Sequence, residues 1–377
     1  MSKVSVSKCS KYNLDKVYKT IKQGLKDINY KIPKGKKILL KPNVLGGYKP
    51  EKAVTTHPII VEAVIKILKE NKCKIVIAES SGFAGSTKRS LKDSGIQALA
   101  DKYKIKAISF ESTEIIKKKI KGKRLNEIVL SKLIDEVDII VNLPKLKTHS
   151  LMTYTAGVKN LFGIIPGGRK PDYHAVAKNP DEFAEILCDI YEAVKPKVKL
   201  TIMDAILGME GNGPAAGKPK QTGLIIVSDD SGALDHTVQK IIGLESPIMK
   251  CLINRKLLNP KEIKIIGKVP KIPYSGPSGF LKMSKFPIWL QKYLERQLIA
   301  HPYVDEKKCV KCGICGKSCP VKAIKLKPYP LFNRNKCIDC YCCHELCPEQ
   351  AIYLKGTFMR TLISKLMRIK LISKKKK

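Results

Sequence analysis

Short, almost continuous apolar runs alternate with stretches of helical periodicity over residues 1–267. Such runs are typical of strands that are covered on both faces, and they lie at 37–43, 73–79, 137–145, 199–206 and 223–229. Between the runs, apolar residues recur at helical spacing in 57–71, 181–194 and 231–243. Strand alternating with helix predicts an α/β domain with a mostly parallel sheet and helices on both faces. Bound ligands should then gather at the carboxyl ends of the strands.

The pattern changes after residue 267. Residues 268–302 predict a linker rich in proline and glycine, followed by a short helix around Trp289. Residues 303–355 are rich in cysteine, and residues 356–377 are a basic tail whose apolar residues fall near helical spacing. The chain is therefore expected to hold an α/β domain, a linker, a small cysteine-rich domain and an amphipathic tail.

Eight cysteines form two copies of the spacing CxxCxxCxxxC, each followed by proline. In this arrangement three thiolates bind one [4Fe-4S] cluster, and the fourth thiolate binds the other cluster. The spacing assigns one cluster to Cys309, Cys312, Cys315 and Cys347, and the second to Cys337, Cys340, Cys343 and Cys319. Structural zinc is disfavoured because it usually takes paired CxxC knuckles. Cys342 departs from the repeat and is interpreted as a bystander.

With this spacing, the module resembles a bacterial-type two-cluster ferredoxin over about fifty residues. The resemblance implies a small α+β ferredoxin-like iron-sulfur domain that exchanges electrons with a redox partner protein. It also implies an anaerobic setting, because exposed clusters are sensitive to oxygen.

Charge and cysteine usage narrow the cellular setting. Nine of the thirteen cysteines crowd into residues 309–347, which indicates reduced thiols and a cytoplasmic protein. The N-terminus lacks the apolar core of a signal peptide, and no apolar run has the roughly 18 residues of a spanning helix. The formal charge of +39 is spread along the chain without a nucleic-acid-binding motif, so nucleic acid is disfavoured as a partner.

Polar residues follow the predicted strands and point to an anion site. They are Lys41 and Asn43 after the first strand, Glu79 after the second, Lys145, Lys147 and His149 after the third, and Asp204 and Glu210 after the fourth. Lys159 and Asn160 follow among the glycines of residues 142–174. Glycines let the backbone approach a ligand closely, and lysines neutralise its charge. The sequence thus predicts a pocket for a small anionic substrate, while the P-loop and GxGxxG patterns of nucleotide sites are not met.

Three of the six histidines, His57, His149 and His174, fall in these same segments. Histidine beside lysine at the end of a sheet indicates either a proton donor and acceptor or a ligand for a metal or a metal-bearing cofactor. Glu79, Asp204 and Glu210 are further candidates for acid and base chemistry. The α/β domain is therefore expected to hold catalytic groups, with an additional metal or organic cofactor as one alternative.

The motifs "KPN", "THP", "ESSG", "NLPKLKTHSLMTYTAGVKNLFG", "DAILGMEGNGPAAGKP" and "VSDDSGALDHTV" resemble those of the family called domain of unknown function 362. The resemblance covers residues 37–245, and that family is frequently followed by the same kind of ferredoxin module. It implies an α/β fold, iron-sulfur clusters and an anaerobic setting, but no particular reaction. More loosely, "GVKNLFGIIPG" is similar to a segment of the nickel-pincer lactate racemases, which implies that Lys159 holds a cofactor.

Three hypotheses follow from the sequence. The first is a cytoplasmic iron-sulfur oxidoreductase in which Lys145, Lys147 and Lys159 hold an anionic substrate and His149 or His174 supplies protons. The second is an electron-transfer or scaffold protein without chemistry of its own. The third is a non-redox isomerase or racemase of a carboxylate. The basic tail predicts contact with an anionic membrane surface or an acidic partner, with packing on the ferredoxin module and a disordered tail as the alternatives.

Overall fold

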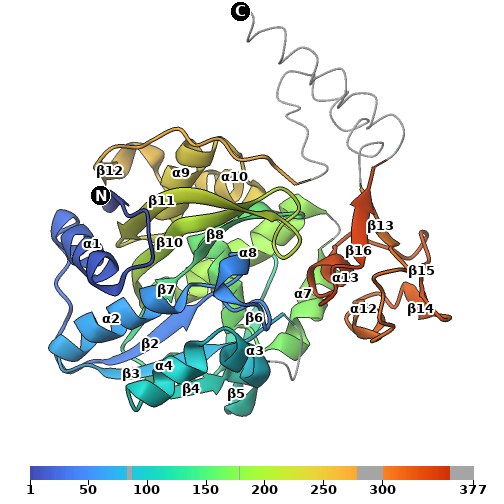
Figure 1. The fold of residues 1–377 in the computed structure, drawn as a ribbon, viewed down its shortest axis with the longest axis horizontal. Helices are drawn as coiled ribbons and strands as arrows, with labels where there is room; N and C mark the ends of the chain where they lie inside the picture. Colours follow the sequence, from blue (N-terminus) through green and yellow to red (C-terminus); the bar gives the residue numbers. More distant parts are fainter. Residues whose placement is uncertain (83–86, 178, 278–299, 357–377) are drawn as a thin grey trace, which may run out of the picture.

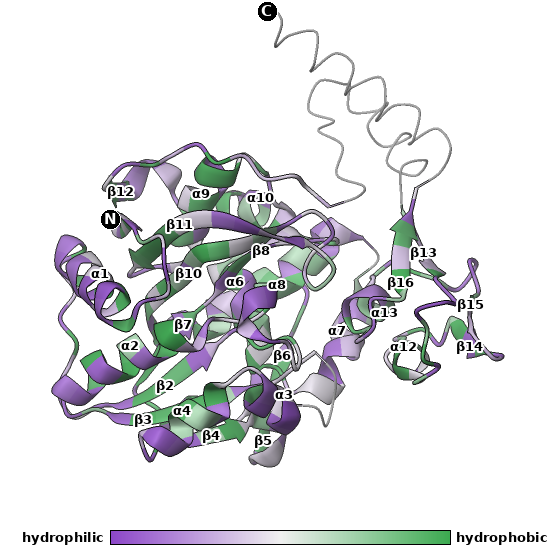
Figure 2. Cartoon of the chain, in the orientation of Figure 1, coloured by the Kyte–Doolittle hydropathy of each residue, from purple (hydrophilic) through white to green (hydrophobic). Residues whose placement is uncertain are grey.

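The computed structural model describes residues 1–82, 87–177, 179–277 and 300–356. Figure 1 shows a large α/β domain built around one twisted sheet, with a small cysteine-rich module beside it. Figure 2 shows that the strands at the centre of the large domain are mainly hydrophobic, whereas the outer faces of its helices are hydrophilic. The apolar runs of the sequence therefore became the centre of the sheet.

The sheet has ten strands in the described part of the chain. They are β1 (Ser2–Lys8), β2 (Lys37–Pro42), β3 (Lys74–Glu79), β4 (Lys106–Ser109), β7 (Ile139–Leu143), β8 (Lys145–His149), β9 (Thr153–Thr155), β10 (Val198–Glu210), β11 (Lys218–Ser228) and β12 (Ile263–Ile266). Their order is β12-β1-β11-β10-β7-β2-β3-β4, with β8 paired to β10 and to β9. A separate hairpin joins β5 (Ile115–Lys119) and β6 (Glu127–Ser131).

The predicted mostly parallel sheet is confirmed. Strands β10, β7, β2, β3 and β4 run parallel to one another, because helical crossovers connect most of them. Strand β11 is antiparallel to β10, to which a short loop joins it, and also to β1. Among the described strands of this sheet, the antiparallel pairs are thus β10–β11, β11–β1 and β8–β9.

Helices cover both faces, as predicted. The longer ones are α1 (Leu14–Asp27), α2 (Pro58–Glu70), α8 (Pro180–Val194), α9 (Ser231–Ile242) and α10 (Pro247–Asn254). The shorter ones are α3 (Thr87–Asp93), α4 (Ile96–Lys102) and α5 (Leu133–Glu136), with 3-10 turns η1 (Pro50–Lys52), η2 (Phe110–Ser112) and η5 (Pro260–Glu262). Alternate residues of a strand enter opposite cores: Leu39 packs with residues of α8 and α9, and Leu40 with residues of α1 and α2.

Residues 144–176 fold over the carboxyl ends of the central strands. After β8 and β9 they form α6 (Gly157–Asn160), η3 (Leu161–Ile164), η4 (Gly167–Arg169) and α7 (Lys170–Val176). α6 and η3 are mostly buried, whereas η4 and α7 are partly exposed, with Lys170, Tyr173 and His174 of α7 buried. They therefore form the floor and one wall of the region in which ligands are expected.

The cysteine-rich module consists of small elements joined by loops. They are β13 (His301–Val304), α12 (Ile314–Lys317), β14 (Ile324–Leu326), β15 (Pro330–Phe332), α13 (Cys342–Glu345) and β16 (Ile352–Lys355). Strand β13 pairs with β16, and β14 with β15, both antiparallel. Figure 1 shows α13 on the side that faces α7 of the α/β domain, and α12 with the β14–β15 hairpin on the outer side.

Direct contacts join the module to the α/β domain. The side chain of Gln350 donates a hydrogen bond to the carbonyl oxygen of Ala215 at 3.0 Å. A side chain at Gly82 would overlap Leu346, since a Cβ there would lie 2.4 Å from the Leu346 Cδ2. The two parts therefore pack closely.

The first part of the expected linker is packed rather than extended into solvent. The backbone N–H groups of Ile272 and Tyr274 donate to the carbonyl oxygens of Ile241 and Ile242, at 2.8 and 2.9 Å, and Tyr274 is buried. The expected helix around Trp289 lies in residues 278–299, which are outside the described part of the chain, as is the tail from residue 357 onward.

Candidate functional site

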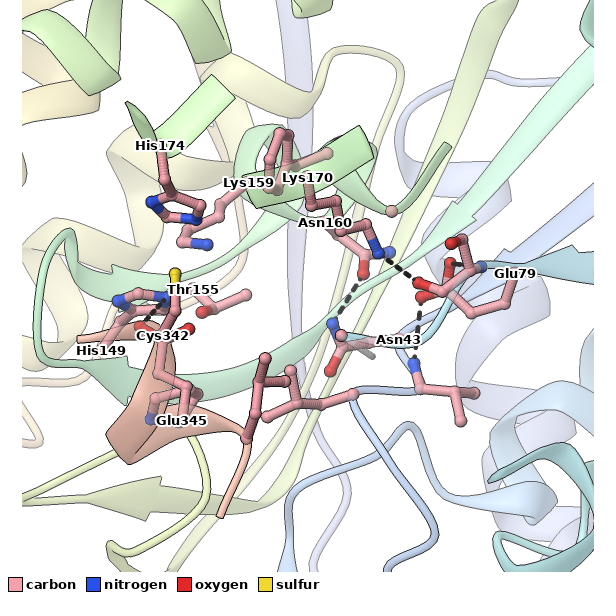
Figure 3. Close-up of a pocket in the computed structure, with 18 of the residues that line it drawn as sticks. Asn43, Glu79, His149, Thr155, Lys159, Asn160, Lys170, His174, Cys342 and Glu345 are labelled. Carbon is pink, nitrogen blue, oxygen red and sulfur yellow. Dashed lines mark hydrogen bonds and ion pairs between the residues drawn. The ribbon is translucent and has the colours of Figure 1, made fainter. Parts of the chain in front are cut away.

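A cavity of about 90 Å³ lies where the central strands end and the cysteine-rich module begins. At about 10–15 Å³ for each water, it has room for a small molecule or roughly six to nine waters. The α/β domain contributes Asn43, Glu79, Lys147, His149, Thr155, Lys159, Asn160, Lys170 and His174, among others. The module contributes Ser318, Cys342, Glu345 and Leu346 (Figure 3).

The structure divides the residues that the sequence selected into three groups. Asn43, Glu79, Lys147, His149, Lys159, Asn160 and His174 line the cavity, with Lys41 behind Glu79. His57, Lys145 and Asp204 form a separate buried cluster. Glu210 pairs with Lys220 at 2.7 Å on the β10–β11 hairpin and accepts from the Ser275 N–H. Most of the predicted residues therefore lie at one cavity, whereas the Asp204 cluster and Glu210 are bonded to residues away from it.

A chain of side-chain amides fixes the floor of the cavity. Lys147 Nζ donates to Asn43 Oδ1 at 2.7 Å, and Asn43 Nδ2 donates to Asn160 Oδ1 at 2.8 Å. Asn160 Nδ2 then donates to Asn142 Oδ1 at 2.8 Å, and Asn142 Nδ2 donates to the carbonyl oxygen of Gly157 at 2.9 Å. Because an ammonium group can only donate, it sets the direction of every amide in the chain.

The carboxylate of Asp235 holds the start of α6. It accepts from the backbone N–H groups of Gly157 and Val158, at 2.5 and 3.0 Å, and burial raises its pKa to about 8. A Cβ at Gly157 would lie 3.0 Å from Asp235 Oδ1, so a side chain larger than hydrogen would crowd this contact. Asp235 thus positions Lys159 and Asn160, which follow in the same turn.

Glu79 is an ion-paired residue of the cavity wall. Its carboxylate accepts from Lys41 Nζ at 2.7 Å, and both side chains are almost fully buried. Burial lowers the pKa of Lys41, and the charge of Glu79 opposes this shift. Glu79 also accepts from the backbone N–H groups of Val44 and Ser80, at 3.2 and 2.7 Å. Its charge is therefore matched within the protein.

The remaining lysines of the cavity have no carboxylate at ion-pair distance in the described residues. Lys159 Nζ lies 5.7 and 5.9 Å from the ring centres of Phe162 and Phe183 and has no hydrogen-bond or ion-pair partner there. Lys147 donates to Asn43 and to the carbonyl oxygen of Val54 at 2.7 Å, which leaves its third N–H. Lys170 donates to the backbone carbonyl oxygens of Ser80 and Ser81.

Burial lowers the pKa of all three lysines. The pKa of Lys147 falls to about 7, because of burial and the neighbouring charge of Lys159, and that of Lys170 falls to about 8. Burial likewise lowers the pKa of Lys159, while Glu345 and Cys342 oppose the shift. The cavity is therefore electropositive and holds groups that titrate near neutral pH.

The two histidines of the cavity are neutral at pH 7. Burial and the charge of Lys159 lower the pKa of His174 to about 3 and that of His149 well below its usual value. His149 Nδ1 accepts from the backbone N–H groups of Leu151 and Met152, at 3.1 and 3.3 Å, so the ring proton is on Nε2. His174 is stacked on Phe183, with ring centres 4.1 Å apart. The His149 N–H is thus directed toward the module.

The module places an acid opposite these groups. Glu345 Oε1 lies 3.3 Å from His149 Nε2 but outside hydrogen-bond geometry, so this oxygen has no hydrogen-bond partner in the described residues. Burial raises the pKa of Glu345 to about 7, while Lys159 and Lys147 oppose the shift. Figure 3 shows the Cys342 thiol and the Glu345 side chain extending from α13 toward His149 and Lys159.

The second buried cluster is centred on Asp204. Lys145 Nζ donates to Asp204 Oδ2 at 2.8 Å, and both side chains are fully buried. The Tyr12 hydroxyl and the His57 backbone N–H also donate to this carboxylate, at 2.8 and 2.9 Å. The His57 ring is stacked on Tyr12 at 3.7 Å, and burial lowers its pKa to about 4. This cluster joins β8, β10 and the N-terminal loop.

Several cysteines of the module lie near one another. Cys309, Cys312, Cys315 and Cys347 line one small cavity of the module, which also has apolar walls. Burial raises the pKa of Cys343, and the charges of nearby Cys340, Cys337, Cys315 and Cys319 add to this shift. Backbone N–H groups of Ala351 and Ala323 donate to the sulfurs of Cys347 and Cys319, at 3.2 and 3.1 Å. Neighbouring thiols with N–H donors and apolar surroundings fit iron-sulfur cluster binding.

Other ligand chemistry has less support in the described residues. No group of three histidine, cysteine or acidic side chains there converges as for a single metal ion. His57 in particular lies in the Asp204 cluster, apart from the two histidines of the cavity. The three histidines do not form one metal site in this arrangement.

Besides Ser80, five polar residues of the cavity were missing from the predicted site residues. They are Thr155, Lys170, Ser318, Cys342 and Glu345. Lys170, like Lys159, is a lysine among the glycines of residues 142–174, so the same reasoning could have selected it. Ser318 and Glu345 had no such signal, because they enter the cavity only when the module docks.

Comparison with known proteins finds a related sequence and a solved structure that aligns with part of the chain. It is 34% identical over 228 residues to the thylakoid-associated protein sll1697 of Synechocystis sp., which covers 60% of this chain and 69% of that protein. A solved structure, the lactate racemase apoprotein from Thermoanaerobacterium thermosaccharolyticum, aligns with a TM-score of 0.38 and 16% identity over 62% of this chain. This chain spans 55% of the racemase chain.

Two family matches account for the two parts of the chain. Residues 302–325 match the 4Fe-4S binding domain, so the module belongs to an iron-sulfur protein. In the described residues, no helix is both long and apolar enough to cross a bilayer. The α/β part matches over residues 38–240, and the chain therefore belongs to the family described as domain of unknown function (DUF362).

Proposed function

We propose that the protein is an iron-sulfur oxidoreductase, in which a small anion bound in the cavity exchanges electrons with two [4Fe-4S] clusters of the module. One observation carries the proposal. The same one-turn helix, α13, holds the cluster cysteine Cys343 and the cavity residues Cys342 and Glu345. A ligand in the cavity would therefore contact residues next to a cluster.

The cationic wall is suited to binding the anion. Lys159 has three N–H groups without a hydrogen-bond partner in the described residues, and Lys147 has one. A carboxylate accepts bonds from several donors at once, and charge-assisted bonds are stronger than neutral ones. Lys159 would therefore be the main anchor, with Lys147 held in place by the amide chain.

Protons for the reduced product would come from groups that titrate near pH 7. Lys147, with a pKa of about 7, and Lys170, with a pKa of about 8, both line the cavity. A general acid acts best when its pKa lies near the working pH. The neutral His149 and His174 are better suited to orient the ligand by hydrogen bonds than to store a proton.

The two cysteine sets would hold the clusters, which supply one-electron transfer when bound. The first set opens toward the surface: Cys312 is exposed, and the side chains of Val310 and Leu326 beside it are 62% and 45% exposed. We propose that a redox partner protein docks at this outer side of the module. The second set, with Cys343 in α13, would be the one nearer the cavity.

The proposal is tested on anaerobically purified protein. The iron content should be about eight per chain, and the dithionite-reduced protein should be reoxidised by a member of a panel of short carboxylates. Lys159→Ala should slow this reoxidation strongly, whereas Lys19→Ala, which removes an exposed lysine of α1, should leave it unchanged.

Three results would contradict the proposal. Fewer than four irons after reconstitution would rule out the two clusters. Conversion of a carboxylate that is indifferent to cluster reduction would support the isomerase or racemase alternative. Stable reduced clusters with every anion of the panel would support the electron-transfer or scaffold alternative.

We further propose a cytoplasmic protein that touches an anionic membrane through its basic tail. Reduced cysteines suit the cytoplasm, and clustered lysines and arginines attract anionic lipid headgroups. The relative from Synechocystis sp. is described as thylakoid-associated. Flotation with anionic liposomes should recover the full chain but not a chain that ends at residue 356, and equal recovery of both would refute the idea.

A further inference from the structure

Three oxygen atoms of the cavity wall have no hydrogen-bond partner. Thr155 Oγ1, Ser318 Oγ and Glu345 Oε1 are three of five such buried side-chain atoms in the described part of the chain. All three residues line the same cavity and are at least nine-tenths buried. Burying a polar group without a partner is costly, so an occupant of the cavity is expected to complete these bonds.

These oxygens come from different parts of the protein. Thr155 ends β9 in the α/β domain, whereas Ser318 and Glu345 belong to the module. Lys159, which lacks a partner for its charge, lines the same cavity. The cavity therefore offers two kinds of contact, a cation for an anionic group and neutral or acidic oxygens for a hydrogen-bonding group.

The charge of the cavity favours an oxygen over an amino group at the second position. Glu79 is already matched by Lys41, which leaves Lys147, Lys159 and Lys170 against Glu345. The cavity thus carries an excess of positive charge, and a second ammonium group would be repelled. A hydroxyl or carbonyl oxygen adds no charge and bonds to the hydroxyls of Thr155 and Ser318.

The size and the apolar lining limit the rest of the ligand. The cavity holds about 90 Å³, and Leu45, Phe162 and Leu346 form apolar parts of its wall. These dimensions suit a carbon chain of a few atoms.

We propose that the ligand is a short carboxylate that carries a hydroxyl or carbonyl oxygen, and that Thr155, Ser318 and Glu345 form its oxygen subsite. The carboxylate lies at Lys159, and the second oxygen bonds to the subsite. The inference rests on the proposed function in placing an anion in this cavity, and it adds that the module supplies two of the three subsite residues.

Pairs of carboxylates that differ by one oxygen test the subsite. Binding of acetate and glycolate, and of propionate and pyruvate, is measured by anaerobic calorimetry on the oxidised holoprotein, with glycine and inorganic phosphate alongside. Because a neutral hydrogen bond contributes modestly, the member with the extra oxygen should bind about two- to tenfold more tightly. The Thr155→Val/Ser318→Ala variant should lose this advantage but still bind acetate.

Controls separate the subsite from the clusters. Ser112→Ala removes an exposed hydroxyl and should keep the full advantage. Ser318 precedes Cys319, so Ser318→Ala could disturb the cluster. Thr155 lies outside the module, and Thr155→Val alone should reduce the preference for the carboxylate with the extra oxygen while the iron content stays unchanged.

Four results would overturn the inference. They are equal affinity within both pairs, tighter binding of glycine than of glycolate, tighter binding of phosphate than of every carboxylate, and an advantage that survives in the double variant. All are read from the oxidised protein without turnover. A failure here is therefore distinct from failure of the proposed electron exchange, which is read from reoxidation of the reduced clusters.

Discussion

Replacing Lys145 by methionine should destabilise the α/β domain without weakening anion binding. Lys145 and Asp204 are 2.8 Å apart, and neither side chain is exposed. Lys145→Met keeps most of the volume but leaves the Asp204 carboxylate buried without its cation. Breaking a buried pair on one side costs about 3–5 kcal/mol, more than the loss of an exposed pair. At about 2–4 °C per kcal/mol for a domain of this size, the melting temperature should fall by roughly 6–20 °C.

The control is an ion pair of similar length at the surface. Lys132 and Glu114 are 2.6 Å apart, but their side chains are 49% and 62% exposed. Exposed pairs contribute about 0–1 kcal/mol, so Lys132→Met should lower the melting temperature by roughly 4 °C at most. Anaerobic circular dichroism melts of the two variants are compared, and carboxylate affinity is measured at a temperature where both are folded.

A second variant identifies the cause of the loss. Lys145→Met/Asp204→Asn removes the buried charge. The amide oxygen can still accept from the His57 N–H, and the amide NH2, at the position of the other oxygen, can donate to the Tyr12 hydroxyl. It should recover at least half of the loss. Equal melting temperatures for the single and double variants would show that the buried charge is not responsible. Weakened carboxylate binding in Lys145→Met would show that the Asp204 cluster belongs to the binding site after all.

Four further predictions concern the cavity and the module. Carboxylate affinity should fall as the pH rises from 7 to 9, because Lys147 and Lys170, with pKa values of about 7 and 8, lose the proton that attracts the anion, and a flat titration would contradict this assignment. The pKa values of Lys147 and Lys170 are lower in the folded protein than in the unfolded chain, so the unfolded chain binds more protons between about pH 7 and 10. The contribution of these two lysines to the free energy of unfolding should therefore rise with pH over this range, as urea unfolding at several pH values can show. Gly163→Ala should destabilise the domain by about 1–3 kcal/mol in such experiments, because its Cβ would lie 2.6 Å from Lys41 Nζ and Glu79 Oε2, and unchanged stability would contradict this packing. Cys315→Ser should lose about four of the eight irons whereas Cys342→Ser should retain all of them, and equal losses would show that the cysteine assignment is incorrect.

The strands of the sheet were predictable because they are buried on both faces. β2, β3 and β7 begin and end within two residues of the apolar runs that predict them. β1 escaped prediction because it alternates apolar residues with serine and lysine. Its Ser5 is fully buried and donates to Asp27 Oδ2 at 2.7 Å, a bond that no local pattern indicates.

The candidate site was predictable in part. Lysines at strand ends were correctly expected near the carboxyl edge of the sheet, but their partners depend on register. Lys145 and Lys147 are two residues apart in β8, yet Lys145 meets Asp204 of β10 and Lys147 meets Asn43. The sequence could not separate a structural ion pair from an available cation in such neighbours.

The contribution of the module could not be predicted. Ser318 and Glu345 follow Lys147 by more than 170 positions, and their place in the cavity depends on how two domains pack. Cys342 did carry a signal, since it breaks the cysteine repeat. That signal set it apart from the predicted cluster ligands but did not reveal that it faces Lys159.

The single turn of α13 has a consequence for the working cycle of the protein. Cys343 and Glu345 are two residues apart in that turn, so the module cannot withdraw its cysteines without also withdrawing part of the cavity wall. Under the proposed electron exchange, a movement of α13 away from the α/β domain would therefore separate Cys343 from the cavity and open the cavity at the same time. Such an arrangement would protect reduced clusters from discharging into a solvent-filled site, because a wide-open cavity has no nearby electron donor.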